Sequence, residues 1–257
     1  MDSAEAASWL IDTEIDARIW IDIDVGYHRT GVPFDDETAL MEIAAVARGA
    51  RPGIELQGLL THAGHSYEAR SPEEVRGIYL DSVAKMHSVR TALRHVGIDA
   101  QISIGDTPCC SVVERFDGVD EVRPGNFIFY DLQQLRMGTC TEDDLALAVA
   151  CPVVACYPAR GEVVIQGGAV HLSKDSVLDE AGLPTFGRIA LPRSEAWDLL
   201  PAETCLRSIS QEHGVIRGPA DILGGMTPGD LVLVLPAHAC LTADALRTYV
   251  TLDGEDL

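Results

Sequence analysis

Residues 19–32 read IWIDIDVGYHRTGV, and this stretch decides the fold class of the N-terminal half. Its first seven residues alternate apolar and acidic side chains, which is typical of a strand with one buried face. Residues 36–48 have helical periodicity and begin with acidic residues, which suit the positive end of a helix. Residues 54–60 (IELQGLL) predict the next strand. A strand, a helix and a second strand in this order predict parallel pairing through a crossover helix.

A long helix is predicted at residues 71–95, and Ser71-Pro-Glu-Glu marks its start. Serine caps a helix, Pro fits its first position, and a Glu three residues after the serine completes a capping box. The apolar face of this helix contains Val75, Tyr79, Val83, Met86, Val89 and Leu93. Lys85 lies off that face, so we expect its side chain to be solvated. Residues 100–104 and 119–122 predict two further strands.

The pattern changes near residue 140, where short strands joined by Gly- and Pro-rich turns replace the alternation of strands and helices. The predicted strands are residues 145–157, 162–166, 188–191, 215–217, 231–235 and 246–251. Such a series predicts an all-β domain, either a small barrel or a sandwich. We therefore expect an α/β domain at residues 1–138 and a β domain at residues 139–257. The α/β domain has about four βα units, whereas a (β/α)8 barrel takes ~250 residues, so the pattern alone also permits a small open sheet.

The charge of the chain limits its partners. Among 257 residues there are 40 acidic and 19 basic side chains, which gives a formal net charge of −21. Nucleic-acid phosphates and anionic membranes would be repelled, so we expect neither nucleic acid nor membrane as a partner. One small anionic ligand is compatible with this charge, because backbone N–H groups can bind a phosphate without Lys or Arg.

The sequence also predicts a compartment. No apolar run approaches the ~20 residues of a membrane helix, and the first residues lack the basic and apolar segments of a secretory signal. The seven cysteines have no CxxC spacing, and their expected state without a secretory signal is the reduced thiol. We therefore expect a cytoplasmic protein.

Two turns that contain Gly and Pro follow predicted parallel strands. Gly105-Asp-Thr-Pro follows residues 100–104, and Arg123-Pro-Gly-Asn follows residues 119–122. The carboxyl ends of barrel strands carry functional sites, and glycine lets backbone N–H groups approach an anion. These turns are candidates for phosphate binding, although ordinary turn chemistry also explains their composition.

Polar residues follow the first two strands as well. His62 and His65 come after residues 54–60, and two histidines at this spacing could ligate a metal or act as acid and base. A polar loop with hydrogen-bonded histidines is the alternative. Arg29 follows residues 19–25 and could bind a carboxylate, a phosphate or a phenolate oxygen, with a surface ion pair as the alternative.

The triplet His238-Ala-Cys240 follows residues 231–235. In an extended chain, residues two apart point to the same side, and imidazole with thiolate suits zinc. Two protein ligands leave open coordination positions, as in catalytic zinc sites. The alternative is a core cysteine beside a hydrogen-bonded histidine. A further polar triplet, Glu212-His213-Gly214, is compatible with a site or with a simple turn.

Seven segments, taken together and in order, carry a resemblance that none of them carries alone. They are IDIDVGYHRTGV, GLLTHAGHSY, SIGDTPCCS, EVRPGNFIFYD, GGAVHLSKD, SQEHG and LPAHACLT. Over residues 18–248 the chain resembles the D-serine dehydratase and D-threonine aldolase family, which are fold-type III pyridoxal-phosphate enzymes related to alanine racemase. The resemblance implies about the last four βα units of a (β/α)8 (TIM) barrel, followed by a C-terminal β domain that completes the site.

The resemblance also implies roles for single residues of the N-terminal half. Arg29 matches an arginine near the ring of pyridoxal 5'-phosphate, and Tyr67 matches a tyrosine that contacts this cofactor. Thr107, Gly125 and Asn126 match the cradle of the cofactor's phosphate.

In the C-terminal half, His238 and Cys240 match the zinc pair of the family. The HxC form resembles D-serine dehydratase, whereas many D-threonine aldolases have HxD. Ala237 stands where an Asn often precedes the histidine, so we expect different surroundings of the metal.

The implied activity is that of a lyase that acts on small D-β-hydroxy amino acids. It is the β-elimination of D-serine to pyruvate and ammonia, in which the cofactor stores electrons and zinc binds the β-hydroxyl. A retro-aldol lyase of the D-threonine aldolase type is one alternative. A non-catalytic remnant, or a module that binds cofactor and metal, is the other.

The lysine that carries the cofactor in this family has no counterpart in the seven segments. It follows the first barrel strand, whereas the first segment of this chain matches about the fifth. The two lysines of the chain, Lys85 and Lys174, lie elsewhere in the pattern. We therefore expect a chain truncated at its N-terminus relative to the family, with open sheet edges. We expect a homodimer or a partner that supplies the missing half-barrel.

Overall fold

A computed structural model describes residues 1–13, 15–49 and 52–256 of the chain. The chain forms two compact units, Met1–Phe127 and Ile128–Leu257, which are called the N-terminal unit and the C-terminal unit below. Each unit has its own sheet and its own hydrophobic core. The sequence-based boundary between residues 138 and 139 lies within the C-terminal unit.

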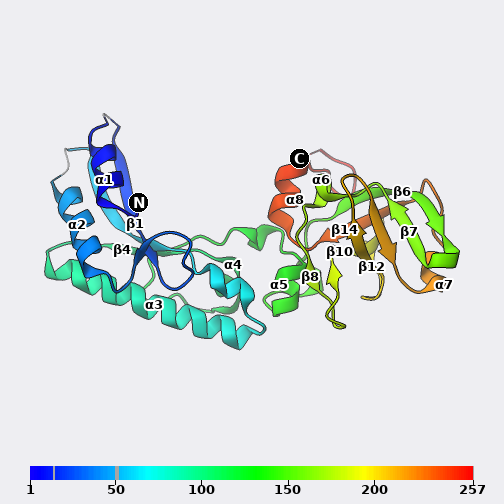
Figure 1. Cartoon of the computed structure of the whole chain (residues 1–257), viewed down its shortest axis with the longest axis horizontal. Coiled ribbons are helices and arrows are strands. Elements are labelled where there is room, and N and C mark those ends of the chain that lie inside the picture. The colour runs from blue at the N-terminus through cyan, green and yellow to red at the C-terminus, as the bar shows by residue number, and fades with distance from the viewer. Residues whose placement is uncertain (14, 50–51, 257) are drawn as a thin grey trace. The chain divides into compact units, whose positions relative to one another are not determined.

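The N-terminal unit contains a five-stranded parallel sheet in the order β2-β1-β3-β4-β5 (Figure 1). The strands are Ala17–Asp24 (β1), Val32–Pro33 (β2), Ile54–Thr61 (β3), Gln101–Ile104 (β4) and Glu121–Val122 (β5). In the register, Leu60 pairs with Asp22 and with Ser103, and Ser103 pairs with Glu121. The carboxyl ends of β1, β3, β4 and β5 therefore lie at one edge of the sheet. The arrangement is that of four βα units and confirms the predicted partial (β/α)8 barrel.

Helices precede, connect and follow these strands. They are Ala4–Ile11 (α1), Glu37–Arg48 (α2), Gly64–Glu68 (η1), Pro72–His95 (α3), Thr107–Val112 (α4) and Asn126–Ile128 (η2). Helices α2 and α3 begin as the sequence predicts, because the side chains of Asp36 and Ser71 accept the N–H groups of Ala39 and Glu74.

The core of the N-terminal unit lies between the sheet and its helices. It includes Ile21 and Ile23 of β1, Leu59 of β3, and Met86 and Leu93 of α3, all of them buried. Alternate residues of β1 are buried, as the apolar and acidic pattern of the sequence predicts.

The edge of β1 that faces away from β3 is hydrogen-bonded. Strand β2 pairs with Ile23 and Asp24. The carbonyl oxygen of Met1 accepts the N–H of Asp22 (2.8 Å), and the amino group of Met1 donates to the carbonyl oxygen of Trp20 (2.8 Å). At these positions the edge is occupied, in contrast to the open edge expected for half a barrel.

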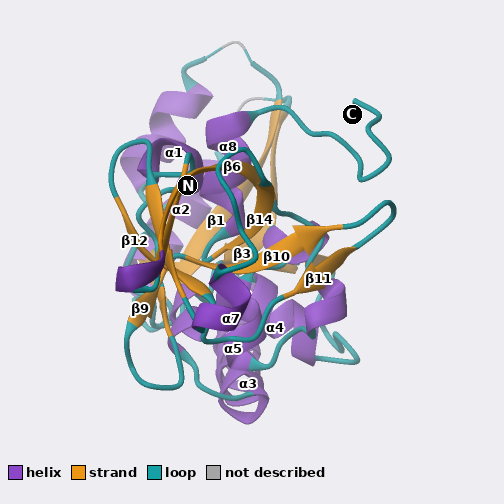
Figure 2. Ribbon diagram, turned by 90° about the vertical axis from the view of Figure 1, so that its right-hand side faces the viewer, coloured by secondary structure: helices purple, strands orange, loops and turns teal. Residues whose placement is uncertain are grey.

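The C-terminal unit contains a closed antiparallel barrel in the order β10-β12-β13-β7-β6-β14, in which β14 also pairs with β10 (Figure 2). The strands are Val149–Tyr157 (β6), Glu162–Ile165 (β7), Gly187–Pro192 (β10), Cys205–Ile209 (β12), Gly214–Arg217 (β13) and Leu231–Pro236 (β14). Three short strands lie outside the closed ring: Val177–Leu178 (β8), Pro184–Thr185 (β9) and Trp197–Leu199 (β11). Along β6, the core residues Val149, Cys151 and Val153 alternate with exposed ones. The barrel confirms the first of the two predicted all-β architectures.

The C-terminal unit also contains short helices that the sequence does not predict. They are Leu132–Met137 (α5), Glu142–Asp144 (η3), Pro158–Arg160 (η4), Ala169–Leu172 (α6), Ala220–Leu223 (α7) and Ala239–Leu246 (α8). The predicted strand at residues 246–251 is wrong. Helix α8 extends to Leu246, Arg247 has a φ of 58°, and Val250 forms only an isolated bridge with Asp256. Local β preference gives no strand at residues 247–251, because these residues have no pairing partner in the barrel.

Glu212 and His213 lie in the turn of the hairpin formed by β12 and β13. The N–H of Ser210 donates to the carbonyl oxygen of His213 (2.8 Å), which closes the turn. This geometry agrees with the simpler interpretation of the triplet.

The prediction that Lys85 is solvated is wrong. Its side chain is 22% exposed, and its Nζ lies 2.6 Å from Oδ2 of Asp81 and donates to the carbonyl oxygen of Val25 (2.9 Å). The same Nζ lies 4.9 Å from the ring centroid of Phe34. The long aliphatic stem lets the charged end of Lys85 reach from α3 to the end of β1.

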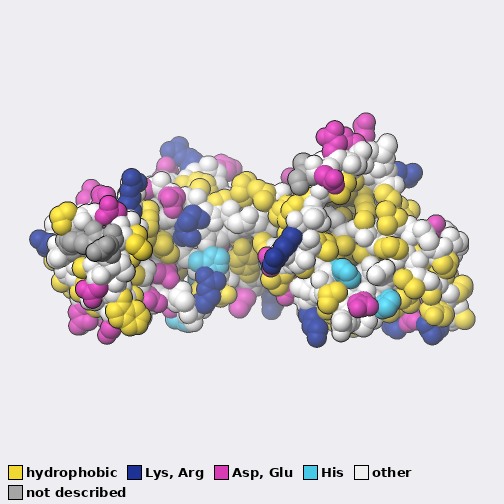
Figure 3. All heavy atoms as spheres, turned by 90° about the horizontal axis from the view of Figure 1, so that it is seen from above, with side chains coloured by type: hydrophobic (Ala, Val, Ile, Leu, Met, Phe, Trp, Pro, Cys, Tyr) yellow, Lys and Arg dark blue, Asp and Glu magenta, His cyan; other side chains and the backbone are white. Residues whose placement is uncertain are grey.

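Two features of the described residues concern membrane-spanning helices and the distribution of surface charge. No helix among these residues has the length and apolar character needed to cross a membrane. On the face shown in Figure 3, Lys and Arg side chains are dispersed among acidic and apolar ones.

Gly58 allows a close contact in the sheet and provides a test of its packing. An added Cβ would lie 2.5 Å from the carbonyl oxygen of Gln101 and 2.5 Å from the ring of Trp20. We therefore expect Gly58→Ala to lower the free energy of unfolding by about 1–3 kcal/mol through overpacking. A urea titration of the purified chain measures this change.

Gly77→Ala is the matched control for this substitution. Gly77 lies in α3, where an added Cβ meets no atom within 4 Å, and alanine is the better helix former by about 1 kcal/mol. This variant should be at least as stable as the parent chain. A Gly58→Ala chain with unchanged stability would contradict the packing of Trp20 over Gly58.

Candidate active site

The loop after β1 is shaped by Asp24 and carries Arg29. Oδ1 of Asp24 accepts the N–H groups of Gly26 (2.8 Å) and His28 (3.0 Å), and its Oδ2 lies 2.8 Å from Nδ1 of His28. These contacts turn the chain at the carboxyl end of β1. Arg29 is exposed, and its guanidinium carbon lies 5.3 Å from the ring centroid of Tyr27.

The loop after β3 begins with His62, whose ring lies near the rings of two tyrosines. The ring centroid of His62 lies 5.8 Å from that of Tyr27 and 6.2 Å from that of Tyr67. Nδ1 of His62 is hydrogen-bonded to the carbonyl oxygen of Gly105. A carbonyl oxygen can only accept, so Nδ1 carries a proton. Burial lowers the pKa of His62, and the charge of Arg29 lowers this pKa further, so the ring is neutral with a lone pair on Nε2.

His65 faces a different set of neighbours. Its Cε1 lies 3.9 Å from the position of an added Cβ on Gly26, and Nζ of Lys85 lies at the same distance from that position. Within the residues that the structure describes, no group of three or more His, Cys, Asp or Glu side chains is arranged to hold a metal ion. His62 and His65 therefore differ in their neighbours, and Nδ1 of His62 is engaged by the carbonyl oxygen of Gly105.

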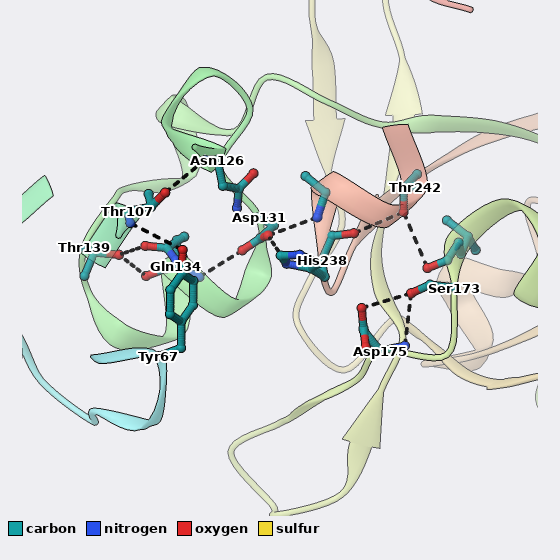
Figure 4. A network of polar contacts seen from close by, with 12 residues as sticks. Tyr67, Thr107, Asn126, Asp131, Gln134, Thr139, Ser173, Asp175, His238 and Thr242 are labelled. Carbon is teal, nitrogen blue, oxygen red and sulfur yellow. Dashed lines mark hydrogen bonds and ion pairs between the residues drawn. The ribbon is translucent and has the colours of Figure 1, made fainter. Parts of the chain in front are cut away.

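Three residues that the sequence assigns to the cofactor form a hydrogen-bonded chain in the N-terminal unit (Figure 4). The N–H of Thr107 donates to the hydroxyl oxygen of Tyr67 (3.3 Å), and Oγ1 of Thr107 accepts the N–H of Asn126 (2.9 Å). Thr107 and Asn126 are buried, and Tyr67 is half-buried. The chain of hydrogen bonds joins the loops that follow β3, β4 and β5.

Asp106 fixes the start of α4, which places Thr107. Oδ1 of Asp106 accepts the N–H of Cys109 (2.8 Å) and the hydroxyl of Ser66 (2.8 Å). The first bond caps α4, and the second ties this helix to η1. Thr107 is the first residue of α4, so its N–H points out of the end of the helix.

Arg123 is a candidate residue to which the sequence analysis gave no role. Its Nη2 donates to the carbonyl oxygen of Thr61 (2.7 Å), and its Nε donates to Oγ of Ser103 (2.7 Å). The guanidinium lies over Gly105, where an added Cβ would come within 2.7 Å of Nη1. Only glycine permits this approach, which brings a positive charge to the ends of β3 and β4. The motif Arg123-Pro-Gly-Asn marks this turn in the sequence, but it does not show which groups Arg123 binds.

The donors of these loops fit a phosphate group. Tyr67 and Thr107 offer hydroxyls, and the backbone of Gly125 and Asn126 offers N–H groups. An added Cβ on Gly125 would meet no atom within 4 Å, so an anion has room to approach this part of the loop. The N–H groups of Thr107 and Asn126 bind neutral hydroxyls, and the charged oxygens of a phosphate accept stronger hydrogen bonds than a hydroxyl does.

The histidine and cysteine assigned to the metal lie at the start of α8 in the C-terminal unit. His238 is the N-cap residue, and Cys240 is the second residue of the helix. Cys240 is exposed, and the side chain of His238 is 25% exposed. Both donors are therefore accessible, and together they present one imidazole and one thiol.

Asp131, whose side chain is fully buried, contacts His238 (Figure 4). Its Oδ2 lies 3.1 Å from Nδ1 of His238 and accepts the N–H of Ala239 (3.0 Å). Its Oδ1 accepts the N–H of Gln134 (3.1 Å), so Asp131 caps α5 and α8 at once. Asp131 is the last residue of the segment EVRPGNFIFYD, in which its role is not apparent. An Asp directly before a helix is the signal that was available.

The electrostatics of His238 follow from these contacts. The hydrogen bond to Asp131 and the interaction with the Cys240 side chain raise the pKa of His238 to about 10. A metal ion that binds this ring must therefore displace a proton. Imidazole and thiolate suit zinc, and two protein ligands leave positions for water or substrate, so the donor set fits a catalytic metal.

Family comparisons match both halves of the chain. Residues 1–133 match the alanine racemase N-terminal domain, which is more than half of the chain. Residues 146–252 match a serine dehydratase domain.

Two characterised relatives align with most of the chain. D-threo-3-hydroxyaspartate dehydratase of Delftia sp. (strain HT23) is 31% identical over 245 residues, which are 93% of this chain and 63% of the relative. D-serine dehydratase of Dictyostelium discoideum is 27% identical over 259 residues, which are 93% of this chain and 61% of the relative. The chain thus spans about three-fifths of the length of these relatives.

Solved structures agree with the sequence relatives. The Delftia dehydratase has a TM-score of 0.88 at 30% identity, and the match covers 100% of this chain and 70% of that one. A metal-free form of a cysteine-to-alanine mutant of the same enzyme gives the same TM-score of 0.88. D-threonine aldolase from Filomicrobium marinum shares the fold, with a TM-score of 0.80 at 20% identity over 98% of this chain and 63% of that one.

Thr107→Val tests the hydrogen-bonded chain of the N-terminal unit. Valine has the shape of threonine but removes the oxygen that accepts the buried N–H of Asn126. We expect a loss of about 1–3 kcal/mol in the free energy of unfolding and faster amide hydrogen exchange at Asn126. Thr107→Ser keeps the hydroxyl and should exchange as the parent chain does. The contact is refuted if the two variants exchange at the same rate at Asn126.

Proposed function

The chain belongs to the fold-type III family of pyridoxal-phosphate enzymes, and from this membership we propose that it serves in a pyridoxal-phosphate-dependent dehydratase of small β-hydroxy amino acids. The observation that carries the proposal is the hydrogen-bonded chain of Tyr67, Thr107 and Asn126 at the carboxyl ends of parallel strands. Parallel barrels place phosphate sites at this end. The names of the Delftia and Dictyostelium relatives support dehydration as the reaction.

In this proposal the N-terminal unit holds pyridoxal 5'-phosphate. Thr107, Gly125 and Asn126 bind the phosphate with N–H and hydroxyl groups, Tyr67 adds its hydroxyl, and Arg29 lies beside the ring of the cofactor. The bound cofactor stores the electron pair that remains when a proton leaves the α-carbon.

Two further residues hold the cofactor loops in position. The neutral ring of His62 is fixed by its bond to Gly105, and Arg123 ties the loop after β5 to the ends of β3 and β4. Loops with a fixed geometry hold the reacting groups in the orientation that the reaction needs.

We propose that the C-terminal unit binds zinc through Nε2 of His238 and Sγ of Cys240. A metal-free form has been solved for a mutant of the Delftia dehydratase that lacks a cysteine, which favours a metal in enzymes of this kind. Zinc supplies a Lewis acid that makes the β-hydroxyl of the substrate a better leaving group.

For the substrate we propose D-serine, whose β-elimination gives pyruvate and ammonia. The HxC spacing of His238 and Cys240 and the D-serine dehydratase of Dictyostelium support this assignment. D-threo-3-hydroxyaspartate, named for the Delftia relative, has the same β-hydroxyl and is the second candidate. The likeness to D-threonine aldolase rests on the fold alone, so a retro-aldol reaction is the weaker proposal.

The two lysines of the chain are poor candidates for the residue that carries the cofactor. Nζ of Lys85 is engaged by Asp81 and by the carbonyl oxygen of Val25, and Lys174 is an exposed residue of the C-terminal unit. Neither belongs to the loops that form the phosphate cradle. We therefore propose that the lysine comes from a polypeptide segment outside these 257 residues.

Product analysis tests the proposed reaction. The protein isolated from its own cells, with zinc and pyridoxal 5'-phosphate supplied, should convert D-serine to equal amounts of pyruvate and ammonia. D-threo-3-hydroxyaspartate should give oxaloacetate and ammonia. Glycine and an aldehyde from D-threonine, with no pyruvate from D-serine, would identify a retro-aldol lyase instead. No product from any of the three substrates would refute enzymatic function and favour a binding module.

A further inference from the structure

We propose that Asp131 is the positioning residue of the metal pair. It holds His238 in the tautomer that has a proton on Nδ1, leaves Nε2 for the metal, and thereby increases the metal affinity of the C-terminal unit. This inference rests on the proposed function, in which His238 and Cys240 bind zinc.

The tautomer follows from the contacts of Asp131. Its side chain is fully buried, and Oδ2 lies 3.1 Å from Nδ1 of His238. A carboxylate oxygen can only accept, so the proton of this hydrogen bond belongs to Nδ1. The other ring nitrogen, Nε2, is then the one that can donate a lone pair to a metal.

The same contacts argue against Asp131 as a third metal ligand. Oδ2 accepts the N–H of Ala239 in addition to the ring of His238, and Oδ1 accepts the N–H of Gln134. A metal bond to either oxygen would compete with these donors. In the described part of the chain, no arrangement of three or more His, Cys, Asp and Glu side chains could hold a metal. The carboxylate therefore acts through the histidine.

Asp131 also fixes the first turn of α8. Its hydrogen bond to the N–H of Ala239 fixes the position of this residue, which lies between the two ligands His238 and Cys240 in the sequence. Thr242, which is buried, donates its hydroxyl to the carbonyl oxygen of His238 (3.1 Å) and holds the same turn from the other side of the backbone. The imidazole and the thiol are thus placed before a metal binds.

The expected effect comes from the chemistry of metal-bound imidazole. A carboxylate that accepts the proton of the distal nitrogen orients the ring and makes it a stronger donor, and removing such a partner typically weakens metal binding by about 10–100-fold. Asp131 therefore contributes to zinc affinity without contacting zinc.

Two substitutions test this role while the cap of α5 is kept. Asp131→Ser keeps an oxygen that can cap α5 at Gln134 but cannot also reach the ring of His238. We expect its zinc dissociation constant, measured by competition with a chromophoric chelator, to rise about 10–100-fold. Asp131→Asn keeps a neutral acceptor and should show an intermediate value. The thiolate-to-cobalt absorption band of the Co(II)-loaded chain is the second measurement, and it should shift in Asp131→Ser.

Asp144→Asn is the matched control. Asp144 lies in the same unit and its Oδ2 accepts the N–H of Thr141 (2.8 Å), but it has no contact with His238 among the hydrogen bonds that the structure describes. Zinc affinity should be unchanged in this variant. An equal loss of zinc affinity in Asp144→Asn and Asp131→Ser would show a general effect of removing a capping carboxylate and would overturn the proposal.

His238→Ala distinguishes this inference from the proposed function. If His238→Ala binds zinc as the parent chain does, the metal pair itself is wrong. If His238→Ala loses zinc while Asp131→Ser keeps parental affinity, only the positioning role of Asp131 is overturned. The nitrogen chemical shifts of the His238 ring in the zinc-loaded parent chain decide the question even if a variant does not fold. A proton on Nδ1 supports the role, and a proton on Nε2 overturns it.

Discussion

Parallel pairing of β1, β3, β4 and β5 is the constraint on which the N-terminal site depends. It brings to one edge of the sheet four loops that are far apart in the sequence, and these carry Arg29, His62, Thr107 and Asn126. Hydrogen bonds between the loops then fix their geometry: His62 binds the carbonyl oxygen of Gly105, and Thr107 binds Asn126. A shift of one residue in the register would turn each side chain to the opposite face of the sheet and break these contacts.

The C-terminal unit places its metal pair by a different route. Antiparallel closure of β14 on β10 and β6 buries this strand and ends it at Pro236, two residues before His238. The helix that follows needs an acceptor for its first N–H, and Asp131 supplies it from 108 residues earlier in the chain. One buried carboxylate thus satisfies a helix end and orients an imidazole, so the fold and the proposed chemistry depend on the same side chain.

Local signals were sufficient for the parts of the fold that depend on neighbouring residues. The capping residues Asp36 and Ser71 set the starts of α2 and α3, and alternation of apolar and acidic residues located β1. Glycine and proline turns pointed to the loops of Thr107 and Asn126. Contacts between distant residues could not be predicted: Lys85 reaches Val25 across 60 positions, Arg123 reaches Thr61 across 62, and Asp131 reaches Ala239 across 108.

In the proposed function, the loops of this chain bind a phosphate without using a lysine of the chain. Calorimetric titration of the purified protein with pyridoxal 5'-phosphate, and with pyridoxal, which lacks the phosphate, measures this binding directly. We predict saturable binding of the phosphorylated compound, displacement by inorganic phosphate, and at least about tenfold weaker binding of pyridoxal, a difference of about 1.4 kcal/mol. Equal affinities for the two compounds, or a cofactor that borohydride fixes stoichiometrically to Lys85, would contradict a phosphate cradle that works without a lysine of the chain.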